Sequence, residues 1–549
     1  MTAIPVPGPR EGRDPGMFGL VADDVTGANA TAARVAARAG VAGRVVLDPL
    51  PLAGPTAGLA PAGAALVVLP THSRAVEPAV ARRRVRAAFQ ALRSAGCRFF
   101  GKRIDSTLRG NLGAELAGSL EALPGHLAVV VAAFPASGRA TVGGRLQVNG
   151  VPLLATEAAR DPLTPVTDDH VARLLAAQSG LPAAYLPPDG EGYDHRLPER
   201  LRELHRAGTR VVVLDAARDE DIETLAALVA RAPIPVLAVD PGPFFAAWVA
   251  HRLGERPSEG AAGADRHGGP ATPASAAASP AASPAAGRPG GPASPASPGA
   301  AGAGAGPWLV VAGSLTDLTQ RQLAAVTRRW PVPRLHAALP QLLADPVAAA
   351  QTLLPQVEAA LARWGVAVVE TDRSAATTRP TRPPAGSPAA AARNAGRSGG
   401  AIPEGLARQV ARQLGTLAAT LVERLPALAG LVLTGGDTAA AVAAALGAGA
   451  LQVTGELAPL VAAGSLEGGR RPGLAVITKG GLVGDEDLLV HLLEPRVRPL
   501  AEETAAATEG PGPPRGPGSP HPDPGGRSQA AAGARPPRPQ TGTSPGRIP

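Results

Sequence analysis

The most constraining feature of this sequence is a series of short, continuous apolar runs that recurs along the chain. Six fall in the first half, and four fall in the second: Phe18–Ala22, Ala65–Leu69, Arg98–Ile104, Ala128–Ala132, Arg210–Leu214 and Val236–Val239, then Trp308–Ala312, Val366–Glu370, Gly430–Leu433 and Gly473–Thr478. Such runs, bounded by turn residues, are typical of strands buried on both faces. Longer amphipathic or Ala-rich segments separate them. The pattern therefore predicts an α/β fold with mainly parallel sheets and helices on both faces.

The chain has 549 residues, which is too long for one core and suits two α/β domains. Ala-, Pro- and Gly-rich stretches divide it, and such composition buries too little apolar surface to fold. We expect disorder at residues 1–15, 255–306, 373–400 and 497–549. These breaks leave an N-terminal domain at 16–254 and a C-terminal domain at 307–496, the second interrupted by the 373–400 insert.

The positive charge of the chain lies mostly in those stretches. Residues 256–306, 373–400 and 509–549 contain thirteen arginines and four acidic residues. Their formal charge of +9 (13 − 4) exceeds the formal net charge of +8 for the whole chain. The folded parts are therefore nearly neutral, and a nucleic-acid-binding face is not expected. Only 7 Phe, 4 Trp and 2 Tyr are present, which also argues against base stacking.

Several other classes of site and location are excluded by composition. A single cysteine, Cys97, rules out internal disulfides and Cys-based metal centres, and the histidines show no metal-ligand spacing. No apolar run approaches the ~20 residues of a membrane span. The N-terminus has proline and mixed charge where a signal peptide needs an apolar stretch. We expect a cytoplasmic protein that does not bind membranes.

In parallel sheets, ligands collect at the carboxyl ends of strands, so the residues after each run are candidate site residues. The first run ends in Asp23 and Asp24, followed by Val25, Thr26 and Gly27. Two adjacent carboxylates at a strand end point to opposite sides, so at most one faces any given direction. Either Asp24 or Thr26 caps the next helix, or a carboxylate here accepts hydrogen bonds or a proton from substrate hydroxyls.

A second cluster runs from Lys102 through Asp105 to Asn111. It places a carboxylate, Asp105, among the cationic side chains of Lys102 and Arg109. An arginine fork suits bidentate binding of the carboxylate of a small acid. We expect Ser106 or Thr107 to cap the following helix and Arg109 to lie in its first turns.

A stretch rich in glycine and proline, from Phe134 to Pro165, follows the next strand and contains Arg139. The apolar and charged residues between its glycines favour an ordered, functional loop. Asn149-Gly150 within it is a candidate hairpin turn.

Two glycine turns follow strands in the second half. Gly435-Gly436-Asp437-Thr438 connects a strand to a helix and aims free backbone N–H groups at an anion, although a simple helix cap would look the same. Lys479-Gly480-Gly481 repeats this arrangement and adds a lysine that can reach phosphate oxygens. Two such turns in one domain favour a nucleotide-phosphate site.

Taken together, these segments resemble the four-carbon acid sugar kinase family, which includes threonate and erythronate kinases and the related 3-oxo-tetronate kinases. The matching motifs occur in the order of that family and span both predicted domains: residues 22–28, 102–115, 134–144, 148–165, 313–322, 434–439, 455–456 and 478–485. The Asp105-Ser106-Thr107-Leu108-Arg109-Gly110-Asn111 form looks like the threonate or erythronate branch.

The resemblance implies ATP-dependent phosphorylation of the terminal hydroxyl of a four-carbon sugar acid, with Mg²⁺ accompanying ATP and metal ligands unassigned. It implies a sugar-acid-binding N-terminal domain, in which the substrate-facing residues include Asp23, Asp24, Lys102, Asp105, Ser106, Arg109 and Arg139. It implies a nucleotide-binding C-terminal domain, with ATP contacts from Ser314, Gly435, Gly436, Asp437, Thr438, Gly480 and Gly481, to which we add Lys479. Among these, we expect Asp24 or Asp105 to deprotonate the hydroxyl.

The chain also departs from the pattern of that family. Leu460 replaces an expected glycine, and Leu482 and Val483 replace Gly and Phe. Bulky residues do not easily adopt positive φ, so these changes predict a narrower or weaker ATP site. An alternative function is therefore a catalytically weakened member that binds a sugar acid or a nucleotide as a regulatory protein. The sequence allows a homo-oligomer.

Overall fold

The computed structural model describes residues 16–47, 58–61, 63–161, 164–190, 192–254, 306–313, 316–372 and 404–498. The segments expected to be disordered lie outside the described residues, apart from a few residues at their edges. At one such edge, Val497 is buried and Arg498 donates from its backbone N–H to Trp364 O.

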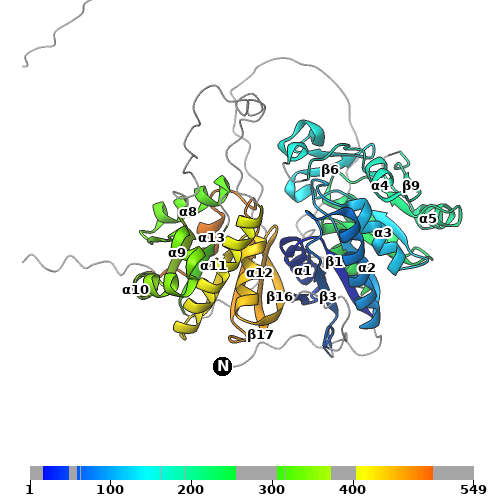
Figure 1. The fold of residues 1–549 in the computed structure, drawn as a ribbon. Helices are drawn as coiled ribbons and strands as arrows, with labels where there is room; N and C mark the ends of the chain where they lie inside the picture. The colour runs from blue at the N-terminus through cyan, green and yellow to red at the C-terminus, as the bar shows by residue number, and fades with distance from the viewer. Residues whose placement is uncertain are drawn as a thin grey trace, which may run out of the picture. The chain divides into compact units, whose positions relative to one another are not determined.

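The N-terminal half alternates strands and helices along the chain (Figure 1). In order these are β1 (Met17–Ala22), α1 (Val25–Ala39), β2 (Gly43–Val46), β3 (Leu66–Pro70), α2 (Pro78–Ser94), β4 (Cys97–Arg103), α3 (Leu112–Ala122), β5 (Leu127–Val130), β6 (Arg139–Val142), β7 (Arg145–Val148), β8 (Val151–Pro152), α4 (Val171–Ser179), β9 (Ala183–Tyr185), α5 (Leu197–Arg206), β10 (Val211–Val213), α6 (Asp219–Val229), β11 (Val236–Asp240) and α7 (Pro243–Arg252). Short 3₁₀ turns at Pro135–Ser137, Leu153–Ala155 and Glu157–Arg160 flank the β6–β8 sheet.

The C-terminal half follows the same alternation until its last third, where two long strands follow each other directly. Its elements are β12 (Trp308–Ala312), α8 (Asp317–Arg329), β13 (Arg334–Ala337), α9 (Leu339–Ala344), α10 (Pro346–Trp364), β14 (Val366–Thr371), α11 (Glu404–Arg424), β15 (Gly430–Thr434), α12 (Gly436–Ala445), β16 (Ala448–Ala458), β17 (Val461–Gly468), β18 (Ala475–Lys479) and α13 (Leu488–Leu493).

All strands except β6, β7 and β8 belong to one continuous sheet in the order β13-β14-β12-β15-β18-β17-β16-β2-β3-β1-β4-β11-β5-β10-β9. Outside the β16–β17 hairpin, all neighbouring strands of this sheet pair in parallel: those from β13 to β18 on one side, and those from β2 to β9 on the other. Three successive pairings, β18 with β17, β17 with β16 and β16 with β2, are antiparallel. The parallel strands of the two halves therefore run in opposite directions.

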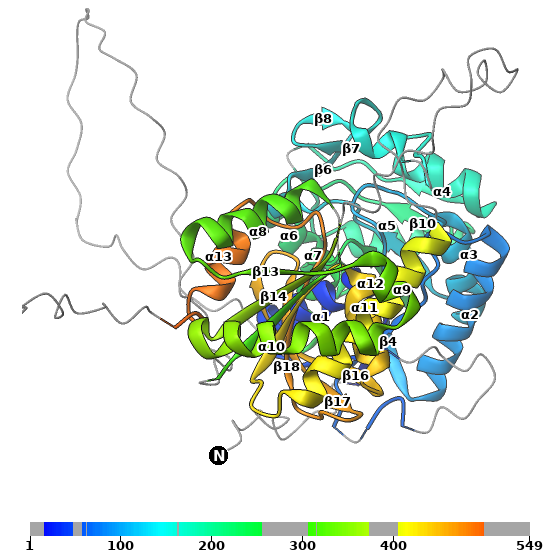
Figure 2. The same cartoon turned by 60° about the vertical axis from the view of Figure 1, so that its left-hand side comes forward.

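Helices cover both faces of each half of the sheet, because alternate residues along each buried strand point to opposite faces. In the N-terminal half, α1, α5, α6 and α7 pack on one face beneath Phe18 and Leu20, and α2, α3 and α4 pack on the other beneath Val21. In the C-terminal half, α9 to α12 cover one face. On the opposite face, α8 and α13 lie side by side, as both views show (Figures 1 and 2).

The few aromatic residues are concentrated under α7. Phe18 stacks on Phe99 with ring centroids 5.1 Å apart, and both rings meet the edge of Trp248. Elsewhere the core consists mainly of Val, Leu and Ala, as the composition predicts, with single buried aromatic residues such as Phe89 and Trp308.

The predicted fold class is confirmed, and each expected apolar run forms a strand. Asn149 and Gly150 have φ values of 51° and 76° between β7 and β8, so the predicted hairpin turn is also confirmed. Two local predictions are wrong, because α3 begins only at Leu112: neither Ser106 nor Thr107 caps this helix, and Arg109 precedes it instead of lying in its first turns. The β16–β17 hairpin was not predicted, since its residues do not form a continuous apolar run.

Candidate functional site

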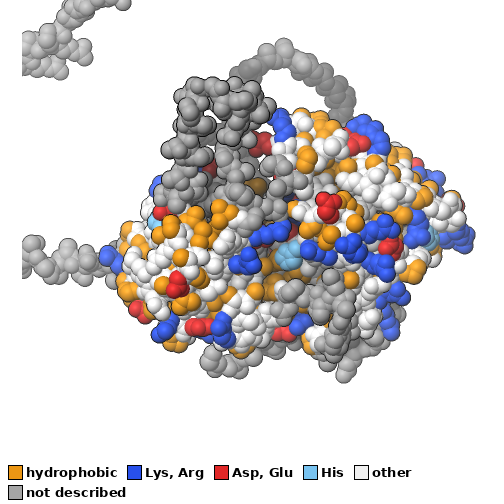
Figure 3. Space-filling model, viewed as in Figure 1, with side chains coloured by type: hydrophobic (Ala, Val, Ile, Leu, Met, Phe, Trp, Pro, Cys, Tyr) orange, Lys and Arg blue, Asp and Glu red, His pale blue; other side chains and the backbone are white. Residues whose placement is uncertain are grey.

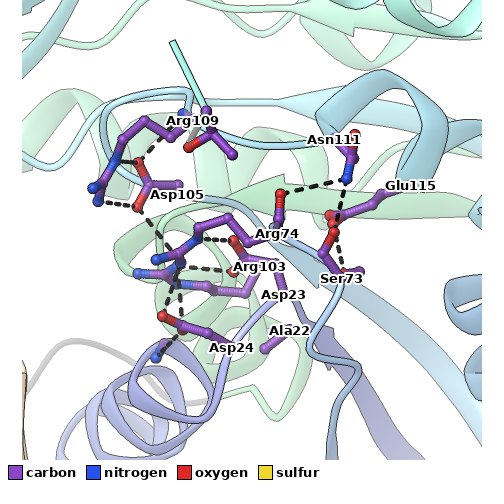
Figure 4. Close-up of polar contacts among 12 residues, drawn as sticks. Ala22, Asp23, Asp24, Ser73, Arg74, Arg103, Asp105, Arg109, Asn111 and Glu115 are labelled. Atoms are coloured by element: carbon purple, nitrogen blue, oxygen red, sulfur yellow. Dashed lines mark hydrogen bonds and ion pairs between the residues drawn. The ribbon is translucent and has the colours of Figure 1, made fainter. Parts of the chain in front are cut away.

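A network of buried charges occupies the carboxyl ends of β1, β3 and β4 (Figure 4). Asp23 is 3% exposed and accepts from Arg74 Nε at 2.7 Å and from Arg103 Nη1 at 3.1 Å. Burial alone would raise the pKa of Asp23, but these guanidinium groups outweigh it and lower the pKa to about 2. Asp23 therefore stays ionised and fixes two arginines at the strand ends.

Asp105 joins the same network from the turn that follows β4. It accepts two hydrogen bonds of 2.9 Å from the Arg109 side chain, and Arg74 Nη2 lies 3.5 Å from its Oδ1. Despite burial, these arginines hold the pKa of Asp105 well below its usual range. Leu108 makes the turn possible by adopting φ 59°, a backbone conformation that is unfavourable for a bulky residue such as leucine.

Arg109 also reaches the loop that precedes α4. Its Nη1 donates to Asp161 Oδ2 at 3.1 Å, and Asp161 Oδ1 accepts from the backbone N–H of Thr164. Arg109 thus ties the loop to the charge network and is held from two sides. Ser106 lies half-buried between Asp105 and Thr107.

Lys102 forms a buried ion pair with a helix residue. It is fully buried, its Nζ lies 2.7 Å from Glu115 Oε2, and Ser73 Oγ donates to the other oxygen of Glu115 at 2.6 Å. Burial raises the pKa of Glu115 above its usual value even with Lys102 beside it. Lys102 is also near enough to Asp23 to help lower its pKa, and its contact with the substrate stays a prediction.

Asp24 is the more accessible of the paired carboxylates. Its Oδ1 caps α1 by accepting from the backbone N–H of Gly27 at 2.6 Å, and its Oδ2 lies 2.9 Å from Arg74 Nη2. Its side chain is 28% exposed. The predicted helix cap is therefore confirmed, and the second carboxylate oxygen is paired with Arg74. Gly27 is required here because a Cβ would overlap the Arg103 guanidinium.

Arg139 lies at the start of β6, and its guanidinium differs from those of Arg74 and Arg109 in its partners. It donates to Ser137 O, and its buried Nε has no hydrogen-bond partner. Among the described residues no carboxylate forms an ion pair with it, although Asp105 is near enough to interact electrostatically. Burial lowers the pKa of Arg139, which means that a bound anion would relieve an unfavourable charge.

In the C-terminal half, the first glycine turn follows β15. Gly435 has φ 97° and donates to Lys479 O at 2.8 Å, which holds the turn against the neighbouring strand β18. Gly436, Asp437 and Thr438 form the first turn of α12, where backbone N–H groups lack helical partners. Asp437 is exposed, whereas Thr438 is buried against Gly313. Ser314, the next predicted residue, lies outside the described residues.

The second glycine turn follows β18. Lys479 is 2% exposed, and its Nζ donates to Gly480 O at 2.9 Å. Burial lowers the pKa of Lys479 to about 8. Gly481 O accepts from the hydroxyl groups of Thr316 at 2.7 Å and Thr319 at 3.0 Å, so the turn is anchored to α8.

The substituted positions do not disrupt these turns. Leu460 adopts φ 67°, the conformation expected to require glycine, and its backbone N–H donates to Glu456 Oε1 at 3.1 Å. Val483 is buried, while its carbonyl accepts from Gln322 at 3.0 Å. Leu482 is 72% exposed and fills no space in the turn. A Cβ on Gly480 would lie 2.9 Å from Val483 Cγ2, so Val483 packs against the second glycine turn, and the narrower or weaker ATP site stays a prediction.

The two sets of residues meet at the N-terminal turn of α1. A Cβ on Gly436 would overlap Thr26 Oγ1, and one on Gly480 would lie 3.1 Å from Thr26 Cγ2. One turn further along α1, Asn29 Nδ2 donates to Thr478 Oγ1 at 3.2 Å. Both glycine turns therefore lie within van der Waals reach of a residue two positions from Asp24.

Arg74, Ser73 and Glu115 are the main residues that the sequence analysis missed. Arg74 contacts three carboxylates, those of Asp23, Asp24 and Asp105. It follows β3 by four residues, so the rule that strand ends carry site residues would have included it. Glu115 carries no such signal, because it lies within α3 and becomes relevant only through its contact with Lys102.

Lys and Arg side chains also gather on the surface over α2 (Figure 3). Two of these arginines, Arg82 and Arg86, pair with Glu121 of α3. Arg84 turns back toward the site and donates to the carbonyl of His72 at 2.7 Å. This basic surface is thus partly neutralised, and the expected absence of nucleic-acid binding stays a prediction.

Comparison with known proteins gives the two halves separate matches. Residues 18–248 match the family model described as a sugar-binding N-terminal domain, and residues 309–489 match the one described as a nucleotide-binding C-terminal domain. A crystal structure of a protein from Salmonella typhimurium LT2 has the same fold, with a TM-score of 0.62 and 21% identity, covering 87% of this chain and 98% of that one.

Two curated relatives match over most of their length. A D-erythronate kinase of Heliobacterium modesticaldum is 33% identical, with 89% of this chain and 99% of the relative covered. A D-threonate kinase of Salmonella typhimurium is 29% identical, with 86% and 97% covered.

The fold and these matches define a phosphotransferase that acts on an alcohol group. More narrowly, the chain belongs to the four-carbon acid sugar kinase family. Within the described part of the chain, no helix is both long and apolar enough to cross a bilayer. The cytoplasmic location stays a prediction.

The contact between Gly436 and Thr26 can be tested by stability. We expect Gly436→Ala to lower the free energy of unfolding by about 1–3 kcal/mol, because its Cβ would overlap Thr26 Oγ1. Thr26→Ala removes that hydroxyl, so the double variant should recover most of the loss, which urea denaturation of all four proteins would show. Gly455→Ala is the matched control, since its Cβ meets no atom within 4 Å. Strictly additive effects of the two substitutions would contradict the contact.

Proposed function

We propose that this enzyme transfers the terminal phosphoryl group of ATP, supplied as its Mg²⁺ complex, to the terminal hydroxyl of a four-carbon sugar acid such as erythronate or threonate. The observation that carries the proposal is the approach of Gly436 and Gly480 to Thr26, two residues from Asp24. This approach places glycine turns of the kind that bind phosphate next to the carboxylate of Asp24. The names of the two curated relatives support this substrate class.

The carboxylate of the sugar acid binds Arg139 in this proposal. The guanidinium of Arg139 has no described carboxylate partner and a buried, unsatisfied Nε, whereas Arg74 and Arg109 are already paired with acids. A guanidinium fork matches a carboxylate bidentately. The anchored acid group then extends the four-carbon chain from β6 toward the end of β1.

Asp24 accepts the proton of the attacking hydroxyl. Asp105 is the weaker candidate, because Arg74 and Arg109 occupy its oxygens and hold its pKa well below the usual range. Asp24 is more exposed and lies closer to the glycine turns. A carboxylate that orients the hydroxyl and receives its proton as the bond to phosphorus forms is sufficient for phosphoryl transfer.

The nucleotide phosphates bind the first turn of α12 and Lys479. Free N–H groups of that turn and the positive end of the helix favour an anion. Lys479 is a buried cation whose depressed pKa a phosphate would restore. Mg²⁺ would enter this site on the ATP phosphates, because it is usually bound through substrate phosphates together with one or two carboxylates.

A substrate panel tests the reaction. Purified protein with Mg²⁺-ATP should release ADP in the presence of at least one of the threonates, erythronates or 3-oxo-tetronates, and Asp24→Asn should lower kcat by roughly 10²–10⁴-fold. Asn also caps helices well, so this variant should remain folded. Tight ligand binding without turnover across the whole panel would instead indicate a sugar-acid- or nucleotide-binding regulatory protein.

Binding of the substrate carboxylate predicts a selective effect at Arg139. Arg139→Gln should raise KM for the sugar acid by about 10–100-fold, the range for hydrogen bonds to a charged group, while KM for ATP changes little. Arg145→Gln is the control, because Arg145 lies on the same small sheet and pairs with Asp169. Steady-state kinetics with both substrates varied would detect the difference. An unchanged sugar-acid KM would exclude Arg139 from the substrate site.

Replacement of Lys479 should raise the stability of the nucleotide-free protein and weaken nucleotide binding. Its folded pKa of about 8 lies below the unfolded value of ~10.4, so the unfolded chain binds more protons between those values and stability rises with pH across that window. At pH 7 the buried charge is unfavourable. Lys479→Met should therefore stabilise the nucleotide-free protein at pH 7 by up to about 3 kcal/mol.

The same variant should lose most of the increase in Tm that ADP or ATP produces in the wild-type protein. Urea denaturation and thermal unfolding with and without nucleotide measure both effects. A nucleotide-dependent increase in Tm equal to that of the wild type would remove Lys479 from the phosphate site.

A further inference from the structure

One residue next to the site has no role in the mechanism above. Its backbone adopts an unusual conformation. His72 follows β3 and has φ 48°, one of four described residues other than glycine with positive φ. The left-handed region is unfavourable for histidine, although histidine, asparagine and aspartate enter it more often than other residues. Such strain persists only where the surroundings impose it, and it is frequent at functional sites.

The surroundings of His72 do impose it. On one side the backbone N–H of Thr71 donates to Ala22 O at 2.9 Å, and on the other the N–H of Ser73 donates to Asp23 O at 3.0 Å. The segment is thereby attached along the last residues of β1, directly before Asp24.

The side chains on either side of His72 are turned inward. Thr71 and Ser73 are buried and their hydroxyl oxygens lie 2.8 Å apart, with Ser73 bonded onward to Glu115. His72 between them is exposed, and Arg84 holds its carbonyl at 2.7 Å. The buried hydroxyl pair thus fixes an imidazole at the surface beside Asp24.

Charged groups from four elements are near enough to influence the charge of this imidazole. Asp24 at the start of α1 and Asp437 in the first turn of α12 attract it, and Arg84 of α2 and Arg408 of α11 oppose its protonation. Because Asp24 belongs to the proposed sugar-acid site and Asp437 to the nucleotide turn, His72 lies where the two meet. The contact of Gly436 with Thr26 places these elements together independently of charge.

The imidazole is mostly neutral at pH 7. Partial desolvation lowers the pKa of His72 below its usual value, and the two nearby carboxylates do not reverse this effect. A neutral imidazole has one N–H donor and one acceptor nitrogen. It can therefore donate to a phosphate oxygen without adding a formal charge.

We propose that His72 is a further catalytic residue, whose imidazole N–H donates a hydrogen bond to the phosphoryl group during its transfer. This inference rests on the proposed function. In the step, the hydroxyl oxygen of the sugar acid bonds to the γ-phosphorus, the bond to the bridging oxygen breaks and its electron pair leaves with ADP. The hydroxyl proton goes to Asp24, and His72 keeps its own proton throughout.

Glycine and asparagine substitutions separate the side chain from the backbone. His72→Gly accepts φ 48° without strain and removes the imidazole, so it should fold normally. We expect its kcat to fall by roughly 10²-fold, the typical loss for one transition-state donor, with both KM values within about threefold of wild type. His72→Asn keeps an N–H donor and tolerates positive φ, so it should retain more activity than the glycine variant. Free imidazole should partly restore kcat of His72→Gly and leave the wild type unchanged.

His195→Gly is the control for loss of an exposed imidazole, because His195 lies in the loop before α5. Wild-type kcat in His72→Gly would overturn the inference, as would an equal loss in the asparagine variant with no response to imidazole. Both outcomes require turnover by the wild-type protein assayed in parallel. Absence of that turnover across the substrate panel would contradict the proposed function itself.

Discussion

The pairing of buried charges at the carboxyl ends of β1, β3 and β4 is the interaction on which the site depends. Asp23 and Asp105 stay ionised although they are buried, because Arg74, Arg103 and Arg109 surround them. Asp240, at the end of the neighbouring strand β11, shows what happens when no guanidinium pairs with the carboxylate directly. It is equally buried, accepts from the backbone N–H groups of Gly242 and Phe244, and has a pKa raised to about 7, although Arg103 is near enough to lower that pKa in part. Among the described residues Asp240 forms no ion pair, and this separates it from Asp23 and Asp105 more than burial does.

The same comparison distinguishes the cations that build the site from those free to bind a ligand. Arg74 and Arg109 donate hydrogen bonds to carboxylates of the protein itself. Their main role is therefore to hold these carboxylates in place and not to bind a substrate. Arg139 and Lys479 have only carbonyl acceptors among the described residues, and burial lowers the pKa of both. Each carries a charge that the folded protein alone does not compensate. Two anionic groups, a carboxylate and a phosphate, would compensate them, which agrees with a fixed electrostatic arrangement prepared for its substrates.

Much of this could be read from the sequence, because strands buried on both faces leave a clear apolar pattern and end where ligands bind. That rule placed Asp24, Asp105, Gly435 and Lys479 at strand ends. It did not indicate the partner of Lys102, which forms an ion pair with Glu115 on helix α3. It also did not anticipate that Leu460 adopts a positive φ, with its backbone N–H donating to Glu456, four residues earlier in the chain. The first is a tertiary contact and the second is a local side-chain contact, and a pattern of apolar residues records neither.

The topology explains why α1 has a special position. Because three antiparallel pairings separate the two sets of parallel strands, the two sets run in opposite directions, and in a flat sheet their carboxyl ends would lie far apart. Strand direction alone would therefore keep the glycine turns apart from Asp24. Helix α1 overcomes this separation, since it packs against β16, β17 and β18 as well as its own strands and presents its first turn to Gly436 and Gly480. The cap that Asp24 provides to α1 and its proposed role as proton acceptor thus depend on the same helix end, where one carboxylate oxygen accepts from Gly27 and the other lies beside Arg74.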